Sequence, residues 1–224
     1  MYYLHEGTEQ FEKPPVNLVW PEMSTNGFDM SEMKEYLSER NLSFELAEAN
    51  GWYPSRHAGD CFLRIVIPAR VMKYKQVYWQ ARAVSLNAFV RYRSPKGPRE
   101  GALIYVSAEP PCEHDPEPTK RVVVVEGPMD ALAAAACGYD AIALMGINPG
   151  VLALDHLKRL VRKRDTLVLL DSEPEATKAA YDVCMILAST GTNAMCATLD
   201  RKKDLASCSL AYRKEFLDDR LGEI

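Results

Sequence analysis

The stretch VVVVEGPMDALAAAACGYDAIALMG, residues 122–146, holds two apolar runs separated by an alanine-rich segment. Four consecutive valines predict a strand that is buried on both faces, as in a parallel sheet. Pro128 suits the first turn of a helix through the alanine-rich segment, and Gly138 suits the C-terminal cap of that helix. AIALM, residues 141–145, is then a second strand. The stretch therefore predicts a strand, a helix and a second strand in succession.

The same alternation continues toward the C-terminus. Apolar periodicity predicts a helix over 152–161, a strand over 166–171, a helix over 175–189, a strand over 193–199 and a last helix over 210–221. Strands that alternate with helices form parallel sheets through right-handed crossovers. We therefore expect an α/β fold with a mainly parallel four-stranded sheet and helices on both of its faces.

The N-terminal half has a different pattern. Two short helices are predicted over about 30–40 and 43–50, the first with Asp29 and Glu32 at the spacing of a capping box. Beyond Phe62 the period changes to two, in FLRIVIP, KQVYWQARAV and AFVRYR, which predicts three antiparallel strands. Because alternate residues of a strand share a face, we expect Arg91 and Arg93 on one face and Tyr92 on the other.

The proline-rich stretch SAEPPCEHDPEPTK, residues 107–120, has no apolar periodicity and predicts a boundary loop. It divides the chain into a smaller α+β subdomain, residues 1–115, and the α/β domain, residues 116–224. A metal site at Cys112, His114 and Asp115 is less favoured than an ordinary polar loop. The six cysteines form no CxxC pair, so we expect free thiols, with neither zinc nor a disulfide framework.

Charge is distributed unevenly along the chain. The net charge is −4, but residues 61–99 hold nine basic residues and no acid, whereas residues 1–60 hold eleven acids and four bases. Clustered Lys and Arg side chains are typical of a surface that binds a polyanion, although a solvated basic face is the alternative. Tyr78, Trp79 and Tyr92 lie among these cations and are candidates either for base stacking or for a small aromatic core.

Composition narrows the class of protein further. Hydrophobic content of 47% and charged content of 26% are those of an ordinary globular protein. No apolar run has the roughly 18 residues that a membrane helix needs, and the N-terminus has no secretory signal pattern. We therefore expect a cytoplasmic protein with no membrane partner.

Carboxylates follow the strands of the α/β half. Glu126 follows the valine run, Asp171 ends the strand 166–171, Glu173 comes two residues later, and Asp204 follows the last strand. Ligand sites form at the carboxyl ends of parallel strands, and hard oxygen ligands select Mg²⁺ or Mn²⁺. One such acid is better explained as a helix N-terminal charge, but several at one edge indicate metal-dependent phosphoryl or nucleotidyl transfer.

Residues 122–146 resemble the first half of the TOPRIM domain of bacterial and phage DNA primases, with Glu126 and Gly127 on its first motif. LVLLDSEPEATKAA resembles the second motif, where family members usually carry Asp-x-Asp and this chain has Asp171, Ser172 and Glu173. The Lys203-Asp204 pair resembles the Lys-Asp that follows the next strand. The resemblance implies that Glu126, Asp171 and Glu173 are catalytic and that they bind Mg²⁺ or Mn²⁺ together with Asp204.

The upstream segments RIVIP, YWQARAV and RYRSPKG resemble the basic subdomain of the primase polymerase core. The match implies contacts to the template or the nucleotide, for which the candidate residues are Arg64, Arg82, Arg91, Tyr92, Arg93 and Lys96. The resemblance covers about residues 30–205. The zinc-binding module of primases has no counterpart in this sequence, so we expect a separate helicase or template-recognition protein as a partner.

The function that the resemblance implies is that of a primase catalytic core, which synthesises short RNA primers from ribonucleoside triphosphates on single-stranded DNA during replication. Two alternatives stay open. A TOPRIM nuclease would use the same carboxylates to direct water at a phosphate. A noncatalytic replication protein would keep the basic surface for single-stranded nucleic acid and use the acids only structurally.

Overall fold

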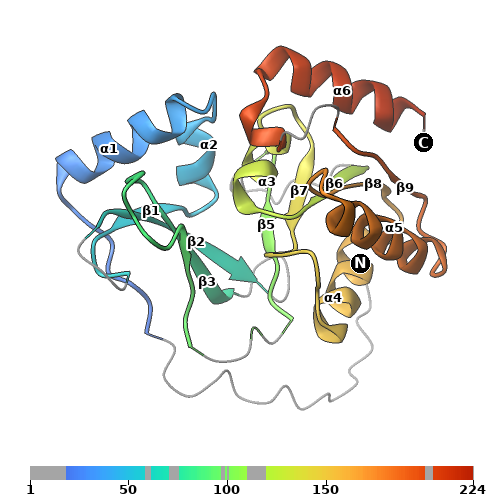
Figure 1. Ribbon diagram of the computed structural model, residues 1–224, viewed down its shortest axis with the longest axis horizontal. Helices are drawn as coiled ribbons and strands as arrows, with labels where there is room; N and C mark the ends of the chain where they lie inside the picture. Colours follow the sequence, from blue (N-terminus) through green and yellow to red (C-terminus); the bar gives the residue numbers. More distant parts are fainter. Residues whose placement is uncertain are drawn as a thin grey trace, which may run out of the picture.

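The computed structural model describes residues 19–58, 62–70, 76–96, 99, 101–109, 120–199 and 204–223. Its strands form two sheets, a four-stranded sheet of order β1-β2-β3-β4 and a five-stranded sheet of order β5-β7-β6-β8-β9. Figure 1 shows the smaller sheet beside α1 and α2, with the larger sheet and α3 to α6 next to it. None of the described helices has the length and apolar character that crossing a bilayer requires.

The smaller sheet is antiparallel throughout. Its part of the chain contains α1 (Gly27–Ser38), α2 (Phe44–Ala49), β1 (Tyr53–Ser55), β2 (Arg64–Arg70), β3 (Gln76–Ala83) and β4 (Tyr92–Arg93). The two predicted helices and the three predicted strands are present, but β4 has only two residues, and β1, which pairs with β2, was not predicted.

The larger sheet contains the four predicted parallel strands. Its elements are β5 (Ile104–Val106), β6 (Arg121–Val125), α3 (Pro128–Ala135), β7 (Asp140–Ala143), α4 (Val151–Val161), β8 (Asp165–Leu169), α5 (Pro174–Ala188), β9 (Ala194–Cys196), the 3₁₀ turn η1 (Leu205–Ser207) and α6 (Leu210–Gly222). The sequence predicted four strands, whereas the sheet has five. The additional strand is β5, which pairs antiparallel with β7 at the edge of the sheet. Three residues give too short an apolar pattern to predict a strand.

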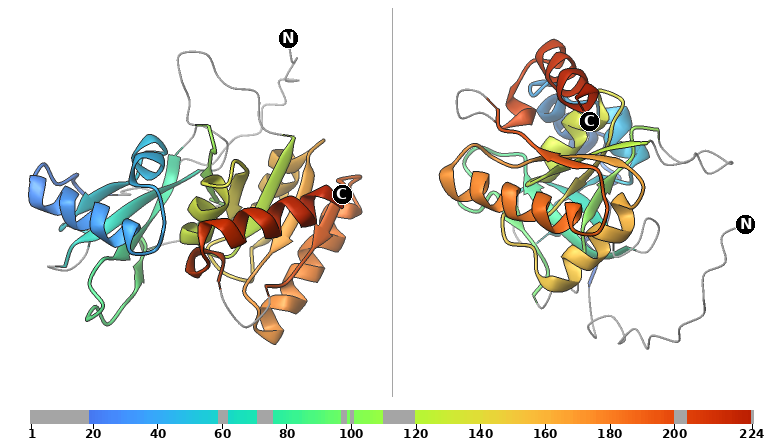
Figure 2. Two further views of the ribbon diagram at one scale, coloured as in Figure 1. Left: turned by 90° about the horizontal axis from the view of Figure 1, so that it is seen from above. Right: turned by 90° about the vertical axis from the view of Figure 1, so that its right-hand side faces the viewer.

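Helices cover both faces of the larger sheet, as predicted. Val123 and Val125 point into a core that includes residues of α3 and α6, while Val122 and Val124 point into a second core with residues of α4 and α5. Figure 2 shows α6 on one side of this sheet and α4 and α5 on the other. Alternate residues of β6 thus serve the two layers, which explains why the strand is apolar throughout.

The two halves of the chain share one core. Met33 and Leu37 of α1 belong to the same apolar cluster as Val123 of β6 and Leu217 of α6. The predicted boundary between residues 115 and 116 lies outside the described residues. The strand β5 precedes that boundary in the sequence and yet belongs to the larger sheet. The sheets therefore meet along continuous packing.

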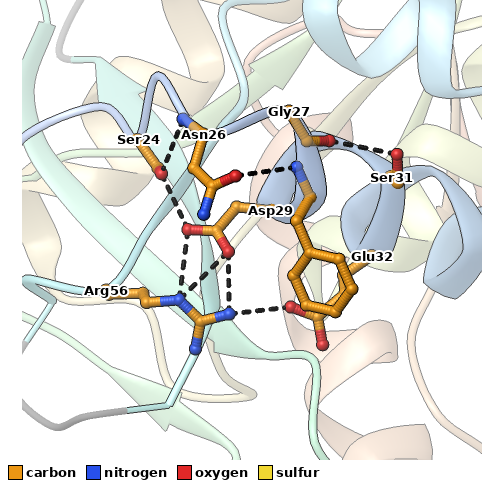
Figure 3. A network of polar contacts seen from close by, with 8 residues as sticks. Ser24, Asn26, Gly27, Asp29, Ser31, Glu32 and Arg56 are labelled. Carbon is orange, nitrogen blue, oxygen red and sulfur yellow. Dashed lines mark hydrogen bonds and ion pairs between the residues drawn. The ribbon is translucent and has the colours of Figure 1, made fainter.

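Asp29 holds the start of α1 in a way that differs from the predicted capping box. The helix begins at Gly27, and the side chain of Asn26 caps it by accepting from the Phe28 amide. Asp29 is buried, and its carboxylate accepts from Arg56 Nη2 at 2.7 Å and from Ser24 Oγ at 2.7 Å (Figure 3). Glu32 accepts from the same guanidinium at 2.9 Å. Both acids of the expected box instead bind Arg56, which joins α1 to the chain after β1.

We expect Asp29→Asn to lower the free energy of unfolding by about 1–2 kcal/mol, since it removes the buried one of the two charged partners of Arg56. The hydrogen bond from Arg56 holds the pKa of Asp29 below its usual value of 3.8. The carboxylate therefore stabilises the fold above that pH, and the contribution is lost as the pH falls through the folded pKa. Urea unfolding at neutral pH and below about pH 3 measures both effects. Glu32→Gln, at the exposed end of the network, is the control and should change little.

Candidate active site

A cleft of about 730 Å³ lies between the two halves of the chain. Its lining comes from both: the N-terminal half gives mainly aromatic and basic side chains together with one acid, Glu39, on one wall, and the C-terminal half gives four carboxylates on the other. The first wall includes Tyr36, Arg40, Arg82, Arg91 and Tyr92, and the second includes Glu126, Asp130, Asp171 and Asp204. A polar cleft with convergent charges of both signs, where two structural units meet, is a candidate site for a charged ligand.

Three of the four predicted acids line this cleft. Glu126 follows the last residue of β6, and Asp171 lies two residues beyond the end of β8, so neighbouring parallel strands deliver both. Asp204 caps η1, and its Oδ1 accepts from the Ser207 amide at 2.7 Å. The expected convergence at the carboxyl edge of the sheet is therefore present in the structure for these three residues.

Glu173 occupies a different position from the other predicted acids. It is exposed at the N-cap of α5 and is not among the residues that line the cleft. Its charge nevertheless raises the pKa of Glu126 and of Asp171. Glu173 therefore contributes to the negative potential of the site from the rim of the cleft.

Burial and mutual repulsion raise the pKa values of Glu126 and Asp171 in the cleft. Burial is the largest cause of the raised pKa of Glu126, followed by the charges of Asp171 and Glu173. Burial also dominates for the raised pKa of Asp171, with Asp204 and Glu173 as the next causes. Carboxylates that raise one another's pKa favour the binding of a cation between them.

Within the described part of the chain, no three His, Cys, Asp or Glu side chains form a group that could hold a metal ion in the observed arrangement. The predicted set of Glu126, Asp171, Glu173 and Asp204 is thus not a closed protein-only site. Mg²⁺ is commonly held by one or two carboxylates together with substrate phosphates. The donor chemistry of the acidic wall fits that open kind of site, because the oxygens line a cleft that a phosphate can enter.

Asp130 is an acid of the cleft that the sequence did not predict. It lies in the first turn of α3, is 9% exposed, and its Oδ1 accepts from the Ala206 amide at 2.9 Å. Burial, with the charges of Asp204 and Asp171, raises its pKa to about 7. The sequence spacing could have indicated this position, because Asp130 follows Glu126 by four residues and lies in the first turn of the helix that begins between them.

The basic wall is a series of cations and rings in contact. Arg82 donates from Nε to the Tyr36 hydroxyl at 2.7 Å, and its guanidinium lies 4.8 Å from the centre of the Tyr92 ring. Arg40 lies 3.9 Å from the centre of the Tyr36 ring. Burial raises the pKa of Tyr92, so its hydroxyl stays protonated. Tyr36 and Arg40 were not predicted, because they lie in the acid-rich first 60 residues and only the fold brings them to the cleft.

The structure changes the expectation for Arg64. Its side chain is fully buried, and it donates to the carbonyls of Ala81 at 3.2 Å and of Val90 at 2.9 Å. A guanidinium that is satisfied by backbone carbonyls inside the sheet has no route to a phosphate. Arg64 instead supports the backbone just before Arg91, and we exclude it from the nucleic-acid surface.

The expected strand alternation of Arg91, Tyr92 and Arg93 is wrong. Arg91 and Tyr92 both line the cleft, whereas Arg93 lines a separate pocket of about 410 Å³ with Trp20 and Trp79. The reason is that β4 starts only at Tyr92, so Arg91 belongs to the preceding loop and does not follow the alternation. Lys96 is exposed and lies outside the lining of the cleft.

Four cysteines lie in the described part of the chain, and the structure shows no disulfide among them: Cys137, Cys184, Cys196 and Cys208. Cys61 lies outside the described residues, as do Cys112, His114 and Asp115 of the proline-rich stretch.

Residues 123–208 match the Toprim-like family model. The matched segment runs from β6 to the end of η1 and contains Glu126, Asp130, Asp171 and Asp204 of the cleft, whereas Glu39 of the lining lies outside it. No curated protein sequence is similar to this chain.

Solved structures with the same fold include catalytic cores of bacterial and phage primases. A DnaG primase catalytic domain bound to ssDNA is 19% identical with a TM-score of 0.66, over 86% of this chain and 71% of that one. The E. coli primase catalytic core is 19% identical with a TM-score of 0.63, over 86% and 73%. The primase fragment of the bacteriophage T7 primase-helicase is 18% identical with a TM-score of 0.62, over 82% and 72%. The resemblance to a TOPRIM primase core is thus confirmed at the level of the fold, on both sides of the cleft.

Proposed function

We propose that this chain is the catalytic core of a DNA primase, which joins ribonucleoside triphosphates into short primers on a single-stranded DNA template with Mg²⁺ or Mn²⁺. The observation that carries the proposal is the cleft itself, where a wall of four carboxylates faces a wall of arginines and tyrosines. The primase fold of the solved structures supports it, and one of those primase catalytic domains is bound to ssDNA.

The acidic wall is proposed to hold the divalent ions through Glu126, Asp171 and Asp204, with Glu173 adding negative potential from the rim. Bound divalent ions neutralise triphosphate charge and stabilise the leaving group in nucleotidyl transfer. Glu126 and Asp171 have raised pKa values in this position, and so they are preorganised to accept cationic charge. No side chain is required as a covalent nucleophile.

The basic wall is proposed to hold phosphates of the template and the nucleotide. Arg82 and Arg91 line the cleft as phosphate-binding groups, and Arg82 is oriented by Tyr36 and Tyr92. Arginine is suited to this role, because its planar guanidinium donates several hydrogen bonds to one phosphate. Arg93 and Lys96 lie outside the cleft and are proposed to act only on nucleic acid that extends beyond it. A separate helicase or template-recognition protein remains the proposed partner for choosing the initiation site.

The test is primer synthesis on single-stranded DNA with labelled ribonucleotides and Mg²⁺ or Mn²⁺. We expect metal-dependent oligoribonucleotides from the wild type and a loss of at least about 100-fold in Asp171→Asn, since a metal ligand contributes several kcal/mol to such a transition state. Asp182→Asn removes an exposed acid from α5 and is the matched control, with unchanged synthesis expected.

Two results would reject the proposal in different directions. Metal-dependent cutting of the DNA without added nucleotides would favour a nuclease that uses the same acids. Single-strand binding that is unchanged by Asp171→Asn, with no synthesis and no cutting, would favour a noncatalytic binding protein.

A further inference from the structure

The loop between β3 and β4 presents apolar side chains to solvent at the edge of the cleft. Phe89 is 102% exposed and Leu86 is 92% exposed, the two largest values among the large apolar side chains in the described part of the chain. Leu86, Ser85 and Ala88 are themselves residues of the cleft lining. A fully exposed phenylalanine next to a binding cleft indicates an interaction surface more strongly than one elsewhere.

The backbone of this loop is fixed at both ends. The Ala83 amide donates to the Arg91 carbonyl at 2.9 Å, and the buried Arg64 guanidinium donates to the Val90 carbonyl at 2.9 Å. Within the loop, the Asn87 amide donates to Ser85 Oγ at 3.2 Å. Phe89 therefore lies in a loop whose backbone is supported on both sides, and its ring is open to a ligand.

Charge around the loop decides what kind of ligand fits. Arg82 and Arg91 flank it in sequence and line the cleft beside it, and residues 61–99 contain no acid. An exposed ring among cations suits single-stranded nucleic acid, whose bases stack on aromatic side chains while its phosphates pair with arginine. A protein partner would find the same apolar side chains, but the cations argue for a polyanion.

We propose that Phe89 is a base-stacking residue, which holds one unpaired base of the single-stranded template at the mouth of the cleft while Arg91 binds an adjacent phosphate. The proposal rests on the proposed function, since it names a specific contact of the same nucleic acid. Leu86 is a second exposed apolar side chain of the same loop and belongs to the lining of the cleft. The result is a fixed template register relative to the acidic wall.

The test is the affinity of the full chain for labelled single-stranded DNA by fluorescence anisotropy, with EDTA present so that no chemistry occurs. We expect Phe89→Ala to weaken binding by about 5- to 100-fold, the range of a lost base–aromatic stack. Phe89→Trp should keep the wild-type affinity, and the fluorescence of the new indole should change on binding. Tyr181→Ala, which removes an exposed ring from α5, is the control and should bind like the wild type.

Oligonucleotides in which an abasic site replaces each base in turn separate stacking from other effects of the loop. At one position, the wild type and Phe89→Ala should bind with equal affinity, because there is no base left to stack. Equal binding of the wild type and Phe89→Ala to the intact strand would overturn the proposal. If Phe89→Ala then failed to bind a protein that the wild type binds, the loop would be a protein-binding surface. A loss that is the same at every abasic position would also overturn it.

The binding test of Phe89 and the primer-synthesis test of the proposed function can fail independently of each other. Binding with the expected Phe89 dependence but without primer synthesis would reject the primase activity and keep the stacking contact. Primer synthesis by the wild type, together with equal DNA binding by the wild type and Phe89→Ala, would support the primase activity and reject the stacking contact.

Discussion

Arg213→Met is expected to lower the free energy of unfolding by about 3–5 kcal/mol, because it leaves several buried backbone carbonyls without a hydrogen-bond donor. The side chain of Arg213 in α6 is fully buried. Its guanidinium donates to the carbonyls of Leu205 at 2.9 Å, Asn41 at 2.8 Å and Arg40 at 2.8 Å. Methionine fills similar space but leaves these carbonyls without a donor.

The position of Arg213 explains why the effect should reach the cleft. One guanidinium joins the turn after α1, which carries Arg40 of the basic wall, to η1, whose Ala206 amide donates to Asp130 of the acidic wall. The hydrogen bonds of this one side chain therefore link the two walls, in addition to the apolar core that the two halves share. We expect the variant to lose nucleic-acid binding as well as stability.

Urea unfolding of both proteins in the same buffer measures the difference. Lys214→Met is the matched control, because it removes a neighbouring positive charge of α6 that is exposed, and it should change the free energy by no more than about 0.5 kcal/mol. An Arg213→Met protein as stable as this control would show that the carbonyls find other donors, and the connection between the walls would have to be assigned elsewhere.

The sequence predicted most of the larger sheet because its signals are local. Valine runs, alanine-rich helices and the residues that start and end them lie within windows of a few residues, and β6, α3, β7 and β8 were found on that basis. The placement of Glu126 and Asp171 followed from the general geometry of parallel sheets. The strand β5 escaped prediction, since its three residues depend on pairing with β7, which is a long-range property.

The basic side of the cleft was harder to predict for the same reason. Residue type identified Arg82, Arg91 and Tyr92, but the burial of Arg64 depends on how β2 packs against β3 and the loop that follows. Tyr36 and Arg40 come from a distant and acidic part of the sequence. Charge patterning predicts where cations are abundant, whereas the fold decides which of them reach a ligand.

Asp130→Asn is expected to stabilise the protein at neutral and alkaline pH. Burial, with the charges of Asp204 and Asp171, raises the pKa of Asp130 from 3.8 to about 7. A carboxyl with a raised folded pKa stabilises the fold fully below its unfolded pKa, and this contribution is lost as the pH rises through the folded pKa. The shift corresponds to about 4 kcal/mol, spread over the interval from about pH 4 to pH 7. Asparagine keeps an oxygen to accept from the Ala206 amide and carries no charge.

Urea unfolding of the wild type and Asp130→Asn at about pH 4 and pH 8, with EDTA to exclude metal ions, tests this expectation. The two proteins should be similar in acid, and the variant should be more stable by up to about 4 kcal/mol in base. Asp182→Asn removes an exposed acid and should show no such divergence. A constant difference between wild type and Asp130→Asn at both pH values would mean that Asp130 has no raised pKa in the folded protein. The divalent ions proposed at Glu126, Asp171 and Asp204 would then have to be tested separately, because Asp130 is not one of their ligands.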